Sequence, residues 1–446
     1  MSSLPPRSSH PGHRSLWPAV VVSILALAGC GRQPLAPIRD TTVPAHPLAR
    51  LAAGGDFGFE GEAVMTLAPG VDAAAFAAEV GALVVGFPEE GLARLAPVPP
   101  ETPAALAIRL AGDPRVLTSE TDGPLEPAET RQQSTGFDDG NGSAQTYAGQ
   151  PIAQVLHLEI AHTISAGAGV KVAILDTGAD LAHPALAGRI AGGYDFVDHD
   201  ADPDDIQTGT DTDGDGSIDE GYGHGTHVAG IVALTAPGAQ LLIARVLDSN
   251  GRGDMLSVAA GVRWAIANGA RVINLSLGSL RHSDAVQNAL AEAEVRGIVC
   301  VVSAGNWGAE QPVEFPASST HAIAVAAIDP ADHAASFTSF GSFVDLSAPG
   351  VSVRSAYPGG RYRLWSGTSM AAPFVSGAAA LLIALHPEWT TNEVQSRLDT
   401  TSQSLLAANP VIGNRLGAGG LDVLGALMPD RGPTGGGGGG HPIEVL

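Results

Sequence analysis

Hydrophobic positions between about residue 150 and residue 428 form short continuous runs that alternate with segments of helical periodicity. Continuous β-branched runs are typical of parallel strands that are buried on both faces. Their alternation with helices predicts a doubly wound α/β domain, with a mostly parallel sheet and a site at the carboxyl ends of its strands. The predicted strands are Val170–Leu175, Leu241–Val246, Val272–Leu275, Ile298–Val302 and Ile323–Ile328, and the predicted helices are 225–234, 254–268, 284–296, 370–386 and 391–399.

A second pattern precedes this domain, in the order strand, helix, two strands, helix, strand. The order is that of a small ferredoxin-like α+β module, the split βαβ arrangement. We therefore expect a separate module over residues 56–128, a polar, glycine-rich linker that contains the processing site over 129–150, and the α/β domain over 151–428. The predicted elements of the module are Glu62–Leu67, Ala73–Val80, Leu83–Gly86, Leu92–Pro97, Pro103–Ala111 and Val116–Thr121.

The amino terminus has the pattern of a secretory signal. Two arginines precede an apolar run over residues 16–29, which is too short for a comfortable membrane span. The run ends in Leu27-Ala28-Gly29-Cys30, which resembles a bacterial lipobox, where the cysteine is lipidated. This interpretation predicts an exported protein held at a membrane through Cys30. Residues 26–28 also form a signal cleavage site, and an uncleaved anchor is the third possibility.

On the first interpretation, residues 1–29 are the signal peptide and residues 30–55, rich in proline and alanine, are a tether. The glycine-rich residues 429–446 are predicted to be a disordered tail. The other cysteine, Cys300, lies in an apolar run and is expected to be a buried thiol. With Cys30 modified, no intramolecular disulfide can form, so stability must come from packing or bound ions. The net charge of −23 argues against a nucleic-acid partner.

Three motifs carry candidate chemistry. Asp176-Thr177-Gly178 follows a predicted strand, so its carboxylate lies at the carboxyl end of the sheet. An aspartic protease would need a second such loop, which the sequence lacks, and a plain turn aspartate is the alternative. The segment from His224 to Gly230 places an imidazole at a helix start, although His224 and His227 could instead be metal ligands. Ser369 begins an alanine-rich helix, as either a cap or a nucleophile beside free N–H groups.

Together these motifs resemble the subtilisin-like serine proteases, the subtilase family, whose catalytic residues come in the order Asp, His, Ser. The resemblance covers about residues 150–428. It implies that Ser369 is the nucleophile, that His224 is the general base, and that Asp176 orients the imidazole. Asn306, otherwise a turn residue, matches the family's oxyanion asparagine.

The same resemblance implies how a substrate is held. The segment Ser276-Leu277-Gly278 matches the family strand that pairs with an extended peptide, and Ala304-Gly305 faces it across the specificity pocket. Glu314, before Phe315-Pro316, resembles a residue beside the pocket base, where a carboxylate would select basic side chains. Its alternative is a solvent-exposed position.

A module ahead of a hydrolase domain implies a prodomain that assists folding and blocks the site, with an accessory domain as the alternative. We therefore expect an exported serine endopeptidase that acts on polypeptides and is made as a zymogen. A catalytically silent scaffold and an esterase with the same triad are the competing functions.

An acidic insertion lies between Asp176 and His224. Its alternate aspartates, with glycine at the sixth position, resemble a calcium loop, whose hard oxygens surround one cation. Tyr222 stands where the last acid usually lies, so Glu220 or another loop must complete the shell. A solvated acidic loop is the alternative, and residues 198–205 form a second acidic cluster. The candidate calcium ligands are Asp211, Asp213, Asp215 and Asp219.

Overall fold

The computed structural model describes residues 61–86, 91–131 and 136–429. Its main feature is a seven-stranded sheet in the order β13-β12-β11-β10-β6-β8-β7, in which all neighbouring strands are parallel. The predicted doubly wound α/β fold is confirmed. The strands are β6 (Lys171–Asp176), β7 (Ile190–Asp195), β8 (Gln240–Arg245), β10 (Val272–Leu275), β11 (Val299–Ser303), β12 (Ile323–Ile328) and β13 (Leu346–Pro349).

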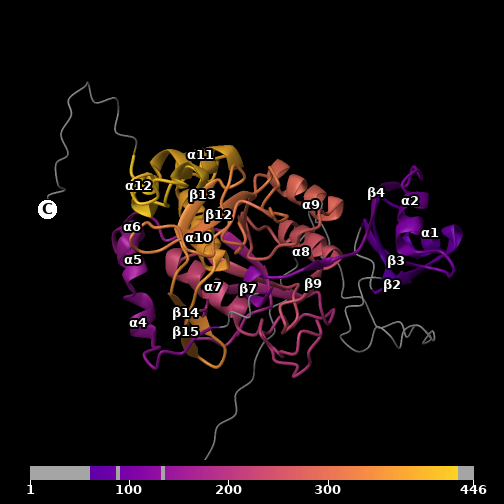
Figure 1. The fold of residues 1–446 in the computed structure, drawn as a ribbon, viewed down its shortest axis with the longest axis horizontal. Helices are drawn as coiled ribbons and strands as arrows, with labels where there is room; N and C mark the ends of the chain where they lie inside the picture. Colours follow the sequence, from indigo (N-terminus) through magenta and orange to yellow (C-terminus); the bar gives the residue numbers. More distant parts are fainter. Residues whose placement is uncertain (1–60, 87–90, 132–135, 430–446) are drawn as a thin grey trace, which may run out of the picture. The chain divides into compact units, whose positions relative to one another are not determined.

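Helices cover both faces of this sheet (Figure 1). Helices α7 (His224–Thr235) and α10 (Thr368–Leu385) pack on one face, and α8 (Met255–Ala267) and α9 (Asp284–Val295) pack on the other. Successive side chains of a strand point to opposite faces, so the apolar run of β6 divides between two cores. Val172 and Ile174 join the core of α7 and α10, while Ala173 and Leu175 join the core of α8 and α9.

The two strands that sequence reasoning missed, β7 and β13, form the edges of the sheet. An edge strand has fewer neighbours, so it needs a less apolar sequence. β7 contains Gly192 and Gly193, and β13 ends in Pro349, which a central strand would not tolerate. A separate antiparallel pair, β14 (Val353–Tyr357) and β15 (Arg361–Trp365), was also not predicted.

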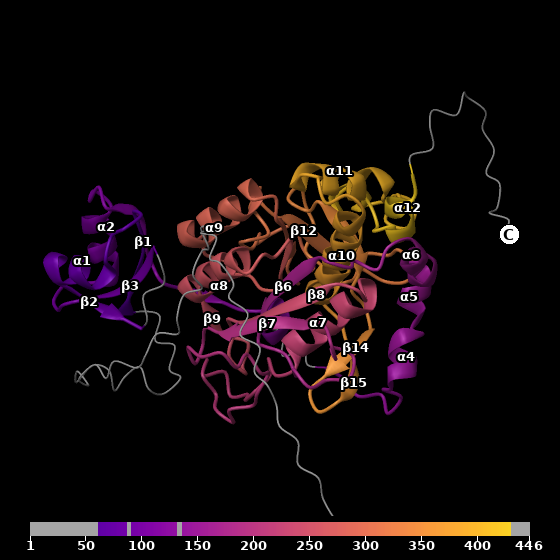
Figure 2. The same cartoon turned by 180° about the vertical axis from the view of Figure 1, so that it is seen from behind.

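The stretch predicted as a linker contains structure. Within it lie α3 (Ala128–Arg131) and α4 (Ala144–Ala148), where Ser143 caps α4 with a capping box. The Tyr147 ring is buried, and its hydroxyl donates to the Gly230 carbonyl at 2.6 Å. Helix α4 is followed by α5 (Pro151–Val155) and α6 (Leu158–Ile164), and the three helices lie along one side of the α/β domain (Figure 2). The carboxy-terminal elements are α11 (Thr391–Thr401), the 3-10 helix η3 (Gly413–Arg415) and α12 (Val423–Leu427).

The amino-terminal module has the predicted element order. A four-stranded antiparallel sheet, β2-β3-β1-β4, carries two helices and has a hydrophobic core of its own around Phe76, Leu95 and Leu106. Asp72 and Thr102 cap the two helices by accepting from backbone N–H groups. The elements are β1 (Ala63–Leu67), α1 (Ala73–Val80), β2 (Ala82–Val85), β3 (Leu92–Pro97), α2 (Pro103–Leu110) and β4 (Val116–Thr121).

Some sequence predictions lie outside the described residues: the signal peptide, Cys30, the tether to residue 55, and the tail beyond Pro429. Among the residues that are described, only α10 is long and apolar enough to cross a membrane. Its apolar window is 89% buried in the protein, as expected for a core helix. Cys300 is a buried free thiol, as predicted.

Candidate active site

Asp176 and His224 meet at the carboxyl end of β6. The His224 Nδ1 atom donates to Asp176 Oδ1 at 2.7 Å, and both side chains are buried. Gly225 permits this approach, because a side chain there would collide with the Gly178 carbonyl and the Asp176 side chain. The Gly225 N–H also donates to Thr177 Oγ1 at 2.9 Å. The two motifs are therefore parts of one packed junction.

The Asp205 carboxylate holds the amino terminus of α7, the helix that begins at His224. The carboxylate accepts from the Gly223 N–H at 3.0 Å and from the Thr226 hydroxyl at 2.6 Å. Burial raises the pKa of Asp205 to about 6. A carboxylate at a helix amino terminus satisfies otherwise free N–H groups. Sequence reasoning placed Asp205 in an acidic cluster and missed this positioning contact.

Ser369 lies in the first turn of α10, and the proline of its motif explains a neighbouring contact. Pro373 has no N–H, so the helix supplies no donor to the carbonyl four residues earlier, that of Ser369. The Ser276 hydroxyl donates to this carbonyl at 3.0 Å instead. The Ser276 carbonyl in turn accepts from Ser369 Oγ at 3.3 Å. The predicted substrate strand and the serine helix are thus joined at Ser276.

The Ser369 hydroxyl makes its shortest contact with a residue that sequence reasoning missed. It donates to Glu129 Oε2 at 2.6 Å, and the Ser369 N–H donates to Glu129 Oε1 at 3.3 Å. Asn306 Nδ2 donates to the same Oε1 atom at 2.7 Å. Asn306 Oδ1 accepts from the Thr368 N–H and hydroxyl, which fixes the orientation of the amide. Glu129 itself is fully buried.

The two histidines of the motif have opposite electrostatics. Burial alone would lower the pKa of His224, but the carboxylates of Asp176 and Glu129 together raise it to about 10. His224 Nε2 lies 3.6 Å from Glu129 Oε2. Burial lowers the pKa of His227 to about 3, and its Nε2 atom contacts the Arg363 carbonyl at 3.2 Å. His227 is therefore a neutral packing residue rather than a second charged group.

An extended segment of the chain lies along the predicted substrate strand. Gly278 exchanges two main-chain hydrogen bonds with Glu126, at 2.9 and 3.0 Å. On its other side the segment forms β5 (Pro124–Leu125), which pairs antiparallel with β9 (Gly253–Asp254). Leu277, which precedes Gly278 in the predicted substrate strand, is buried. Three consecutive residues are thus bound by main-chain pairing, the mode expected for an extended peptide.

Glu314 lies between the two segments predicted to flank a specificity pocket. A side chain at Gly278 or at Gly305 would come against its carboxylate. Glu314 is only 1% exposed, so the solvent-exposed alternative is wrong, and the Trp307 indole donates to it at 2.7 Å. Ala304 is also buried, and the Gly305 N–H donates to Thr368 Oγ1, next to the serine.

The acidic insertion brings together three of the four predicted calcium ligands. Carboxylate oxygens of Asp211, Asp213 and Asp215 lie within 4.8 Å of one another. Asp219 is not part of this group, and its carboxylate accepts from the backbone N–H groups of residues 208 and 209. Glu220 is 5% exposed, and neither of its oxygens has a hydrogen-bond partner among the described residues.

Comparison with known proteins places this geometry in a family. The sequence profile of the subtilase family matches residues 167–419, more than half of the chain. The chain belongs to the subtilase family. It is 40% identical to subtilisin from Bacillus pumilus over 251 residues, 54% of this chain and 86% of that protein. It is also 40% identical to subtilisin NAT from Bacillus subtilis subsp. natto, again over 54% of this chain, but the match spans only 62% of that relative's length.

Two solved structures extend the comparison. A protease from Pseudoalteromonas arctica is 31% identical, with a TM-score of 0.56, and the match covers 61% of this chain and 93% of that one. Fervidolysin from Fervidobacterium pennivorans, a keratinolytic enzyme related to subtilisin, is 25% identical with a TM-score of 0.67. That match covers 84% of this chain and 62% of fervidolysin, so it reaches beyond the region matched by the family profile.

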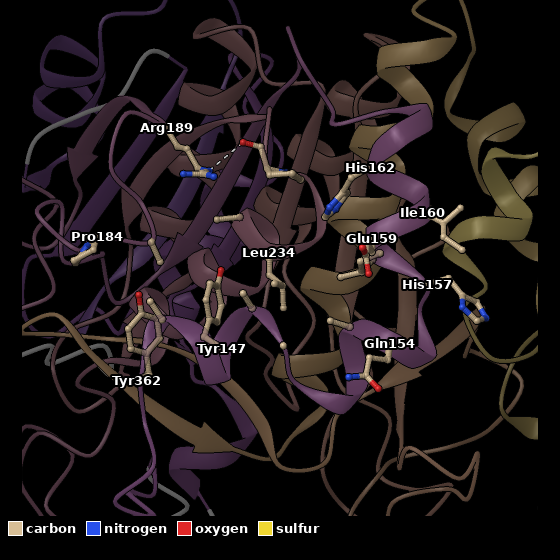
Figure 3. Close-up of a pocket in the computed structure, with 18 residues that line it drawn as sticks. Tyr147, Gln154, His157, Glu159, Ile160, His162, Pro184, Arg189, Leu234 and Tyr362 are labelled. Carbon is tan, nitrogen blue, oxygen red and sulfur yellow. Dashed lines mark hydrogen bonds between the residues drawn. The ribbon is translucent and has the colours of Figure 1, made fainter.

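This subtilase has a further cavity of about 750 Å³ beside α4, α5 and α6 (Figure 3). None of the candidate catalytic residues lines it. Two of its polar side chains contact the backbone: His162 Nε2 contacts the Thr235 carbonyl at 2.9 Å, and Arg189 donates to the Pro237 carbonyl at 3.1 Å. Within the part of the chain that the structure describes, no serine, threonine or cysteine lines this cavity.

Proposed function

We propose that this subtilase is an exported serine endopeptidase, made as a zymogen, that hydrolyses polypeptides through Asp176, His224 and Ser369. The single observation that carries the proposal is the pairing of residues 124–126 with β9 and Gly278, two positions from Ser276, whose carbonyl contacts Ser369 Oγ. In this mechanism Ser369 attacks the peptide carbonyl and His224 accepts its proton. Asp176 holds the imidazole, and Asn306 with the Ser369 N–H stabilises the oxyanion.

The test compares the purified protein with Ser369→Ala, using casein and a serine-directed fluorophosphonate. We expect casein hydrolysis and labelling of the unaltered protein only, with a loss on the order of 10⁶-fold in the variant, the magnitude known for subtilisin itself. Labelling with turnover of esters but not of peptides would favour an esterase. If no form of the protein can be labelled, the scaffold alternative holds.

The amino-terminal module is proposed to be the prodomain. Its β4 strand reaches α9, where the Glu120 carboxylate accepts from the Ser283 hydroxyl at 2.7 Å and from two N–H groups at the start of the helix. Arg94 of β3 joins Asp122 to Asp254 of β9, at 3.0 and 2.5 Å. These contacts support a module that assists folding of the α/β domain, because they complete a helix terminus and pair buried charges.

Calcium is proposed as a structural ion of the acidic insertion. The oxygen donors of Asp211, Asp213 and Asp215 suit this hard cation. Burial, followed by the charges of these aspartates, raises the pKa of Glu220 to about 7, so this carboxylate is poorly solvated where it lies. Asp219 lies outside this group and accepts from the backbone N–H groups of residues 208 and 209, so it is proposed to hold the loop. The ion would hold together a loop that leads directly into the His224 helix.

Lipidation of Cys30 remains a proposal based on its sequence motif. Attachment would hold the enzyme at a membrane until cleavage separates the catalytic domain from its amino terminus. Palmitate should label the unaltered protein but not Cys30→Ser, and equal labelling of the two would contradict lipidation.

A further inference from the structure

The Glu129 carboxylate occupies the donors that the proposed reaction needs. A tetrahedral intermediate places a negative oxygen beside backbone and amide N–H groups. Here those donors, the Ser369 N–H and Asn306 Nδ2, both point at Glu129 Oε1, at 3.3 and 2.7 Å. The other oxygen of the carboxylate accepts from the nucleophile at 2.6 Å. The side chain therefore acts as a resident anion in the place of the oxyanion.

The same carboxylate also changes the base. With Glu129 near its Nε2 atom and Asp176 on Nδ1, the imidazole of His224 has its pKa raised to about 10. Burial would raise the pKa of Glu129, but its contacts with His224, Ser369 and Asn306 hold it below the ordinary value. At neutral pH the pair is thus carboxylate and imidazolium, and a protonated imidazole cannot accept the serine proton.

The shape of the site is adapted to this carboxylate. Any side chain at Gly367 would collide with Glu129 Oε1, so the absence of a side chain at this position leaves room for the carboxylate. Helix α3 begins at Ala128, so the extended conformation of the paired segment ends immediately before Glu129. The Thr130 hydroxyl holds the turn at this helix start by donating to the Pro127 carbonyl at 2.8 Å. The turn directs the side chain of Glu129, rather than a peptide carbonyl, towards Ser369.

Extending the pairing register identifies the peptide bond that an extended chain would bring to the nucleophile. Glu126 is opposite Gly278 in an antiparallel bridge, so continuing the register by two residues places Ala128 opposite Ser276. The Ser276 carbonyl is itself in contact with Ser369 Oγ at 3.3 Å. The carbonyl of Ala128, which is bonded to Glu129, is therefore the peptide carbonyl that comes to Ser369 if the extended conformation continues.

We infer that the Glu129 side chain is an internal inhibitor of this subtilase, and that the chain cleaves itself at the Ala128–Glu129 bond when this side chain leaves the oxyanion site. The inference rests on the proposed serine endopeptidase function. It assigns processing to the Ala128–Glu129 bond and inhibition to the Glu129 carboxylate.

The step consumes one water and no other reactant. Once Glu129 withdraws, Ser369 Oγ attacks the Ala128 carbonyl carbon and its proton passes to His224. The bond from this carbon to the Glu129 nitrogen then breaks, and His224 returns the proton to the departing amine. Water hydrolyses the remaining ester of Ala128, which restores the Ser369 hydroxyl. The products are a carboxyl group on Ala128 and a new amino terminus at position 129.

The experiment follows self-cleavage of the full chain by intact mass and by sequencing of the new amino terminus. Glu129→Ala empties the oxyanion site, and Glu129→Gln keeps the side-chain shape without its charge. We expect both variants to cleave themselves at least tenfold faster than the unaltered chain, with the new terminus at position 129. Glu159→Gln is the matched control, because it removes the same charge from an exposed position on α6 and should cleave at the unaltered rate.

Fluorophosphonate labelling of the uncleaved chains distinguishes the two levels of the proposal. Faster labelling of Ser369 in both Glu129 variants supports the internal inhibitor. Equal rates of labelling and cleavage in all chains would overturn it while leaving the protease function intact. A new terminus elsewhere would overturn the assigned bond. If Ser369 stays unlabelled even in Glu129→Ala, and thermal melting shows that this variant is folded, the proposed function itself fails.

Discussion

Two buried glutamates, Glu129 beside Ser369 and Glu220 in the acidic insertion, differ in how far their surroundings compensate the burial of their charge. Glu129 is fully buried, and it accepts from the Ser369 hydroxyl, the Ser369 N–H and the Asn306 amide. Glu220 is 5% exposed, and both of its oxygens lack a hydrogen-bond partner among the described residues. Their pKa values follow this contrast, lowered for Glu129 and raised to about 7 for Glu220.

The difference indicates what each region still requires. A buried carboxylate costs several kcal/mol unless donors or a cation compensate it. The cleft supplies donors of its own, so Glu129 fills a site that is complete and chemically blocked. The acidic insertion supplies more carboxylates instead of donors, so the described residues do not compensate the charge of Glu220. This difference is the basis for proposing an inhibitor in one region and a calcium ion in the other.

Among changes that keep Ser369, removing the amide donor beside it should have the largest effect. Asn306→Ala should lower the rate of peptide hydrolysis by the processed enzyme about 10²–10³-fold, the loss measured for one such donor in subtilisin itself. The reason is that only the Ser369 N–H then remains to stabilise the oxyanion. The measurement is kcat for a chromogenic peptide, with KM as the internal control. A loss that lies entirely in KM would contradict the assigned role.

The next effect concerns the acidic insertion. Removing calcium with EDTA should lower the melting temperature of the unaltered protein, and a hundredfold excess of calcium over its Kd should restore about 2.7 kcal/mol. Glu220→Gln should reduce this calcium-dependent difference, because the ion loses a nearby carboxylate. Thermal melting with and without calcium measures both.

Asp219→Asn is the control for this experiment, since Asp219 lies outside the group of Asp211, Asp213 and Asp215. Its calcium response should stay close to that of the unaltered protein. An identical melting curve in EDTA and in added calcium would contradict the proposal that the acidic insertion binds calcium.

The sequence predicted the parts of this fold that depend on local pattern. The central strands and the helix of Ser369 were found because their apolar runs are continuous, and the two edge strands were missed because β7 and β13 are not. The candidate triad was found through motifs whose spacing along the chain is distinctive. Asp176 ends a central strand and contacts His224 directly, while His224 and Ser369 both lie beside the Glu129 carboxylate.

Glu129 could not be predicted in the same way. It stands in no motif, and its role depends on a register between residues 124–126 and strands more than a hundred positions away. The polar composition around it correctly suggested a segment outside the domain core, but Tyr147 and α4 show that much of this segment packs against the domain. A local pattern carries no information about such long-range pairing.

The charge on Glu129 should also be visible in the pH dependence of self-cleavage. His224 faces Asp176 on Nδ1 and Glu129 near Nε2, while His227, with its pKa lowered to about 3, is neutral. Because docking of Glu129 raises the pKa of His224, docking is strongest below the undocked pKa and weakens as the pH rises towards about 10. Self-cleavage of the unaltered chain should therefore accelerate through the alkaline range.

In Glu129→Gln the amide does not raise the pKa of His224, so half-maximal self-cleavage should come at a lower pH than in the unaltered chain. Initial rates between pH 6 and about pH 10, the docked value, measure the two midpoints. Identical midpoints would show that the carboxylate does not act through the base.

The smallest effect concerns the choice of substrate. Glu314 is buried against Gly278 and Gly305, which are proposed to flank the specificity pocket, so we expect its carboxylate to meet the side chain preceding the cleaved bond. Charged hydrogen bonds contribute about 1.5–3 kcal/mol, so Glu314→Gln should lower the preference for arginine over leucine at this position by about tenfold or more. The measurement is the ratio of kcat/KM for two peptides that differ only in the residue preceding the cleaved bond.

The same carboxylate should affect self-cleavage. Because the Ala128 side chain is too short to reach Glu314, Ala128→Arg should speed self-cleavage of the otherwise unaltered chain. The increase should be much smaller when Glu314→Gln is also present. Equal cleavage after arginine and leucine by the unaltered enzyme would leave Glu314 as a packing residue bound to Trp307.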